Sequence, residues 1–111
     1  MQRTKANISY SIETEDLAKF AKALGHPTRI KIIKYLSSQS YCHTSELLDF
    51  LPLAQSTVSQ HLKELKDAGL IHGEINPPKV KYCIDQENWQ KAKQLFCTFF
   101  DIDLKPNSCK I

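Results

Sequence analysis

The chain has 111 residues, 41% of them apolar, and a formal net charge of +3. This length predicts one domain spanning 1–111 with a modest core, and a dimer would carry twice the charge, which favours a polyanionic partner. Its apolar runs fall short of the roughly 18 residues that a membrane span needs, and no apolar leader follows the first residues, so we expect a cytoplasmic protein.

The first segments in chain order are a polar arm and a helix. Residues 1–13 are polar and unpatterned, so we expect a loose arm there. Thr14 is the expected cap of a first helix, with acidic residues behind it that favour its positive end, and Gly25 ends this helix. The apolar positions recur at helical spacing and are Leu17, Phe20, Ala21 and Leu24.

A second and a third helix follow. The pair His26-Pro27 opens the second helix, which runs to Leu36, because proline favours the first helical position. Residues 41–43 are too few for a helix and are expected to form a brief strand. A third helix, capped by Thr44 or Ser45, is expected to end at Pro52.

The most informative stretch is the helix predicted after Pro52. On a helical projection Val58, Leu62 and Leu65 fall on one face. The opposite side carries hydroxyl, amide and ammonium groups, the groups that read base edges and bind phosphates in a DNA major groove. These residues are Ser56, Thr57, Ser59, Gln60 and Lys63. Gly69 suits the left-handed residue that ends a helix.

A hairpin and a last helix complete the predicted order. Residues 70–75 and 80–84 are expected to form two strands joined by a turn at 76–78. Asp85 is the expected cap of the last helix, and residues 102–111 are expected to form a loose tail. The order predicts a mainly helical fold with a small β-hairpin, a winged helix-turn-helix with an extra helix at each end.

Two separate motifs of this chain are Leu24-Gly25-His26-Pro27-Thr28-Arg29-Ile30 and residues 55–65 followed by Ala68-Gly69-Leu70. The first resembles the opening signature of the ArsR/SmtB family of repressors, and the second resembles the recognition helix of that family. The likeness covers roughly residues 15–100. It implies a homodimer joined mainly through the first and last helices. It also implies repression of a nearby operon, relieved by a metal, a metalloid or a thiol-reactive signal.

These readings assign contacts to individual residues. The polar face of the recognition helix is expected in the major groove of an inverted-repeat operator in double-stranded DNA, with Lys79 and Lys81 of the wing on flanking phosphates. His61 lies at the edge of the apolar face, where it either packs or touches a phosphate. The first and last helices supply the expected dimer interface, which consists of Leu17, Phe20, Trp89, Phe96, Phe99 and Phe100.

The four cysteines are the candidate sensor. Family members that bind arsenite often carry Cys-x-Cys near the start of the third helix, but His43 and Ser45 occupy the best-matching positions here. In a winged helix the short strand pairs with the second wing strand, which would bring Cys42 close to Cys83. Two such thiolates can bind a thiophilic ion such as arsenite, with Cys97 or Cys109 as a third ligand, and no other cofactor is expected.

Other interpretations of the cysteines remain open. Cys42 and Cys83 can instead oxidise to a disulfide, or simply pack in the core. In persulfide-sensing family members a cysteine near the position of Cys97 pairs with one on the second helix, where this chain has Lys34. The last helix contains no histidine, so it cannot form the zinc site that other members build there.

Two further alternatives concern the whole protein. A winged helix can dock a protein partner instead of DNA, and affinity for DNA that falls steeply with salt separates these two functions. A repressor can also act with no small-molecule sensor. Enzyme chemistry is not expected, because the sequence shows no activated nucleophile with an orienting acid and no glycine-rich phosphate loop.

Overall fold

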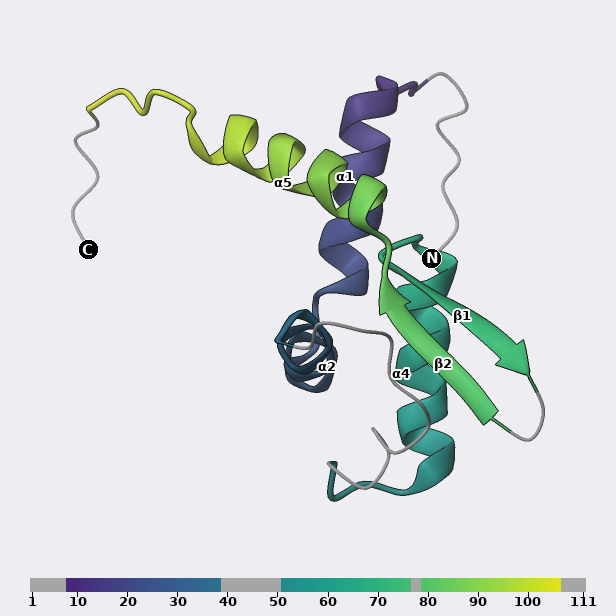
Figure 1. Ribbon diagram of the computed structural model, residues 1–111. Coiled ribbons are helices and arrows are strands. Elements are labelled where there is room, and N and C mark those ends of the chain that lie inside the picture. Colours follow the sequence, from purple (N-terminus) through teal and green to yellow (C-terminus); the bar gives the residue numbers. More distant parts are fainter. Residues whose placement is uncertain (1–7, 39–50, 77–78, 107–111) are drawn as a thin grey trace.

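The computed structural model describes residues 8–38, 51–76 and 79–106. Within these ranges the elements follow in the order α1 (Ile12–Ala23), α2 (Pro27–Ser37), α4 (Gln55–Asp67), β1 (Ile71–Asn76), β2 (Lys79–Ile84) and α5 (Gln86–Phe100). The strands pair antiparallel in one sheet. In Figure 1, α5 crosses α1 and the hairpin lies beside α4. The strand expected at 41–43 and the helix expected from Thr44 or Ser45 lie outside the described residues.

Helix α1 begins earlier than predicted. Its N-cap is Ser11, whose Oγ accepts a hydrogen bond from the backbone N–H of Thr14 at 3.1 Å. The prediction that Thr14 caps the helix is therefore wrong, and Ile12 and Glu13, assigned above to a loose arm, are helical. Serine is among the best N-cap residues, and the acidic side chains that follow Ser11 favour this earlier start equally well.

Helix α2 begins as predicted. His26 is its N-cap and accepts the backbone N–H of Thr28 on Nδ1 at 3.0 Å, and Pro27 occupies the first turn. This helix is buried along one side through Ile32, Ile33 and Leu36, and it packs on both α4 and β2. Helix α2 therefore supports α4 from its buried side.

One hydrophobic core joins all six elements. Its largest fully buried side chains come from α1, α2, α4 and the start of the hairpin, and they are Phe20, Ile32, Val58, Leu65, Leu70 and Ile71. Each stabilises the fold by about 1.5–3 kcal/mol relative to an exposed position. Half-buried residues of α5 pack against this core from outside it, namely Trp89, Leu95 and Phe96.

The segment between α4 and α5 is closed by hydrogen bonds at the root of the hairpin. Gly69 has a φ of +87°, so the left-handed end of α4 predicted from the sequence is confirmed. The backbone N–H of Asp85 donates to the carbonyl of Leu70 at 2.9 Å, and Asn88 Nδ2 donates to the carbonyl of Gly69 at 2.9 Å. Asp85 also caps α5, as predicted, by accepting the N–H of Asn88 at 3.0 Å.

Helices α1 and α5 are joined by an ion pair as well as by apolar packing. Lys91 Nζ lies 2.8 Å from Oδ2 of Asp16, whose side chain is only 17% exposed. This hydrogen bond from Lys91 is the main cause that holds the pKa of Asp16 below its usual value.

None of the helices in the described part of the chain has the length and apolar character that a membrane span requires.

Candidate nucleic-acid interface

Helix α4 has one buried face and one face open to solvent. Val58 and Leu65 are fully buried and Leu62 is 3% exposed, as the helical projection predicted. The expected base-reading residues are all exposed, and these are Ser56, Thr57, Ser59, Gln60 and Lys63. The N-cap is Ala54, which makes no side-chain capping bond. An α-helix with an outward row of hydroxyl and amide groups has the size and chemistry that fit a DNA major groove.

Two side chains of this face are held by acidic residues one turn further along the helix. Lys63 Nζ lies 2.7 Å from Oδ2 of Asp67, and Gln60 Nε2 donates to Oε2 of Glu64 at 3.3 Å. The hydrogen bond to Asp67 is also the main cause that raises the pKa of Lys63. Each of these side chains thus has one of its hydrogen-bonding positions occupied within the helix.

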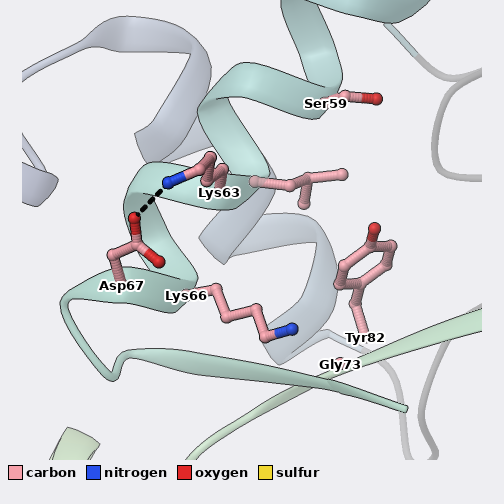
Figure 2. Close-up of a pocket in the computed structure, with 7 residues that line it drawn as sticks. Ser59, Lys63, Lys66, Asp67, Gly73 and Tyr82 are labelled. Atoms are coloured by element: carbon pink, nitrogen blue, oxygen red, sulfur yellow. Dashed lines mark hydrogen bonds and ion pairs between the residues drawn. The ribbon is translucent and has the colours of Figure 1, made fainter. Parts of the chain in front are cut away.

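A groove of about 300 Å³ separates α4 from the hairpin. Figure 2 shows Lys66 extending across it toward Tyr82, while the ammonium group of Lys63 turns back to Asp67. Gly73 faces the Tyr82 ring so closely that a Cβ there would lie 3.2 Å from it. The sequence analysis missed Lys66 and Tyr82, although the position of Lys66 three residues after Lys63 was a usable signal for a shared helix face.

The two wing lysines fall on the second strand. Lys81 is exposed and stands opposite Glu74 in the register, and Lys79 is the first residue of β2, opposite Asn76. The strand therefore carries both lysines on the tip-side half of the hairpin, and their contact with phosphates stays a prediction.

His61 points inward. It is 9% exposed, and its Nδ1 accepts a hydrogen bond from Nε of Arg29 at 3.1 Å. The ring also lies 4.3 Å, centroid to centroid, from that of His26. Of the two roles considered for His61, this geometry favours packing over a phosphate contact. Arg29, which the sequence analysis gave no individual role, is brought to the site by the fold.

The two described cysteines differ in burial and in bonding. Cys83 is half-buried on β2 and is disulfide-bonded, whereas Cys97 on α5 is free and exposed. Cys42 and Cys109 lie outside the described ranges. No three histidine, cysteine, aspartate or glutamate side chains gather into a metal site within 8–38, 51–76 and 79–106.

The expected dimer residues divide by burial. Phe20 is 1% exposed and belongs to the core of its own chain, so it offers no surface to a second copy. Leu17, Trp89 and Phe96 are half-buried. The exposed members are Phe99, at 49%, and Phe100, at 75%.

Comparisons with known proteins agree with this geometry. Residues 26–72 match the family described as "Bacterial regulatory protein, arsR family". The transcriptional repressor PagR of Bacillus anthracis is 36% identical over 75 residues, which cover 60% of this chain and 76% of PagR. The chain belongs to the ArsR/SmtB family. The resemblance seen in the two sequence motifs is therefore confirmed.

Solved structures of ArsR-type regulators share the fold. An ArsR-like transcriptional regulator from Rhodococcus sp. RHA1 aligns with a TM-score of 0.65 at 22% identity over 78% of this chain and 81% of that one. A "possible transcriptional regulator for arsenical resistance" aligns with a TM-score of 0.65 at 29% identity over 74% and 83%. The predicted winged helix-turn-helix fold is thus confirmed. Regulators of the ArsR family bind DNA and are not enzymes.

The ion pair between Lys63 and Asp67 yields a prediction for this ArsR-family regulator. In Asp67→Asn, Lys63 loses its anionic partner and the exposed face of α4 loses a negative charge. We expect affinity for operator and random DNA to rise together by about threefold, with a salt dependence steeper by about one phosphate contact. Fluorescence anisotropy across a salt series measures both. Asp103→Asn, an exposed change in the tail, is the matched control, and an equal gain there would contradict the assignment.

Proposed function

We propose that this chain is a homodimeric transcriptional repressor that inserts α4 into the major groove of an inverted-repeat operator. Lys79 and Lys81 of the wing would lie on the flanking phosphates. The observation that carries the proposal is the division of α4 into a buried face that includes Val58 and Leu65 and an exposed face of hydroxyl and amide groups. Helix propensity alone does not favour serine and threonine at exposed helix positions, where alanine, glutamate and lysine are better helix formers.

Gln60 tests the assignment of sequence reading to this face. Gln60→Ala removes an amide that can pair with an adenine edge, an interaction worth about 1–3 kcal/mol of discrimination. We expect affinity for the operator to fall about tenfold and affinity for random DNA to fall less than twofold, measured by anisotropy at fixed salt. Gln90→Ala, an exposed amide on α5, serves as the control. Equal losses on both DNAs would remove Gln60 from base reading.

The same salt series separates DNA binding from docking of a protein partner. Contacts with phosphates release counterions, so affinity for DNA falls steeply as salt is added. A flat salt response together with no preference for the operator would favour a protein-interaction module.

A second copy of the chain is the proposed partner of the α1–α5 surface. A groove of about 500 Å³ runs between these helices and includes Leu17, Leu95 and Phe99 in its lining. Apolar side chains continue along the exposed end of α5 and beyond it, namely Phe100, Ile102 and Leu104, at 75%, 54% and 88% exposure. Contiguous exposed apolar surface of this kind is typical of an interface, and two-fold pairing matches an inverted-repeat operator.

Phe99 tests the dimer. Phe99→Asp places a charge in the proposed interface, and we expect the dimer dissociation constant to rise at least tenfold in sedimentation equilibrium. Leu53→Asp is matched in exposure, 42% against 49% for Phe99, and lies next to α4 instead. We expect it to leave dimerisation unchanged. A Phe99→Asp protein that is folded by circular dichroism and still fully dimeric would contradict this surface.

The proposed inducer site is the thiol pair of Cys42 and Cys83, with arsenite as the favoured inducer. Cys83 supports it, because this sulfur is already bonded to another sulfur in the structure. When both thiols are reduced, arsenite can exchange hydroxyl groups for them, forming As–S bonds and releasing one water per bond. A structural relative described as a possible regulator for arsenical resistance points in the same direction. Binding would move the dimer to a geometry that no longer fits both half-sites.

A redox signal is the second candidate, favoured by the disulfide at Cys83 itself. Here two thiols lose two protons and two electrons to a peroxide or a disulfide oxidant and form an S–S bond. The two inducers use the same cysteines and differ in their oxidant requirement. A repressor with no sensor would respond to neither.

Operator release tests both inducers. Reduced protein on its own upstream DNA, titrated with arsenite, is expected to dissociate at near-stoichiometric arsenite. Cys42→Ser and Cys83→Ser should each abolish this release, while Cys97→Ser, at an exposed free thiol, should not. Release by a disulfide oxidant but not by arsenite would replace the metalloid with redox control. Unchanged binding in both titrations would leave a repressor without a thiol sensor.

A further inference from the structure

Arg29 connects three helices through one guanidinium group. It stands in the first turn of α2, and its Nη1 donates to the carbonyls of Lys22 and Ala23 at the end of α1, at 3.2 and 3.3 Å. Its Nε donates to Nδ1 of His61 on α4 at 3.1 Å. Helix C-terminal carbonyls attract a cation, and the rigid planar fork of arginine directs its donors at acceptors on two sides, whereas a lysine ammonium is a compact charge on a flexible stem.

The contact reaches the middle of α4. His61 follows Gln60 directly in the sequence and lies one turn after Thr57. Gln60 and Thr57 both belong to the exposed face of α4. Residues of one helix turn together, so the rotation of α4 that would release His61 from Arg29 would also turn Gln60 and Thr57 away from their outward positions. A polar contact at this point selects one rotation of α4, which apolar packing alone specifies less sharply.

We propose that the Arg29–His61 hydrogen bond, here named the α2–α4 clamp, positions α4 for reading the operator, and that protonation of His61 opens it. Arg29 and His61 are positioning residues in this proposal and do not contact DNA. The inference rests on the proposed function only in that operator reading is its output.

The clamp requires neutral His61. Nδ1 accepts the bond from Arg29, so the ring proton of the neutral form sits on Nε2. A second proton on Nδ1 would face the Arg29 Nε–H and place two cations together in a nearly closed site. The surroundings of the imidazole ring also favour its neutral form. Desolvation by burial is the largest cause that lowers the pKa of His61, followed by the charges of His26 and Arg29, and Glu64 on the same helix opposes them.

The lowered pKa of His61 means that acid destabilises the closed clamp. With its pKa held below the ordinary value of 6.5, His61 resists protonation while the clamp is closed. Well above pH 6.5 the histidine is neutral in the closed and open forms alike, and the clamp is intact. As the pH falls below 6.5, the open form takes up a proton first, so the closed arrangement loses stability. Protonation elsewhere on the surface adds positive charge and strengthens DNA binding, which is the opposite trend.

The test measures the operator preference, defined as affinity for the operator divided by affinity for random DNA. General electrostatic effects of pH cancel in this ratio. For the wild-type protein we expect the ratio to fall about fivefold from pH 7.5 to pH 5.5 at constant ionic strength. His61→Gln keeps an acceptor for Arg29 and removes the titration, so its ratio should change less than twofold over this range. Arg29→Lys should lower the ratio about fivefold already at pH 7.5.

His72→Gln is the matched control. His72 is an exposed histidine on β1, 3.8 Å from Asp85 and outside the clamp, so its variant should keep the wild-type pH profile. A pH profile of His61→Gln equal to that of the wild type, or an Arg29→Lys protein with an unchanged ratio, would overturn the clamp while leaving DNA binding intact. No operator preference in the wild type at pH 7.5 would instead overturn the proposed function, and the positioning role with it.

A second measurement needs no DNA. In ¹H–¹⁵N spectra of the free wild-type protein, the amide signals of Thr57 and Gln60 should shift along the titration of His61. These shifts should be absent in His61→Gln. Amide signals of α4 that stay fixed while His61 titrates would show that the ring protonates without moving the helix, and that result would also overturn the proposal.

Discussion

The burial of one face of α4 is the constraint on which the proposed DNA interface depends. This helix has thirteen residues and an N-cap without a side-chain bond, and several of its residues are serine, threonine, valine or histidine, which are mediocre helix formers. An isolated helix of this length is marginal in water. Val58, Leu62 and Leu65 supply what the sequence of the helix lacks, at about 1.5–3 kcal/mol for each buried side chain. The outward face of α4 therefore exists as a helix face only in the folded protein.

Because the buried face stabilises α4, the side chains of its outer face do not have to stabilise the helix. The interactions found there are weak ones. Lys63 and Asp67 are 65% and 60% exposed, and exposed pairs of this kind contribute about 0–1 kcal/mol. Exchanging Asp67 for a phosphate therefore costs little. Until that exchange, the acidic partners limit the positive charge that the face presents to any polyanion.

The sequence was sufficient for local features. Three residues each satisfy a local backbone requirement that can be predicted from the residue type alone. They are Pro27 at the start of α2, Gly69 at the end of α4 and Asp85 at the start of α5. The cap of α1 was placed at Thr14 instead of Ser11, because both hydroxyl residues precede acidic ones and pattern alone cannot rank them. Boundaries of this kind depend on one hydrogen bond.

Features that depend on distant partners were beyond the sequence. Helical spacing marks Phe20 as apolar, but it does not tell burial in its own core from burial against a second copy, and the structure places it in its own core. His61 lies at the edge of an apolar face, and its partner Arg29 is 32 residues away. The i,i+4 pair of Lys63 and Asp67 could have been read from spacing alone. The polar face of α4 was predicted as exposed and is exposed.

The closed root of the hairpin joins α4 to α5 independently of the length of the wing. Bonds from Asp85 to Leu70 and from Asn88 to Gly69 join the end of α4 to the start of α5, whatever lies between them. The cost of lengthening a surface loop rises only slowly with its length. Insertions at the tip of the wing would therefore leave the packing of both helices intact. The tip of the hairpin is therefore a modular element, whose length and composition can be redesigned without disturbing the bonds at Gly69, Leu70, Asp85 and Asn88.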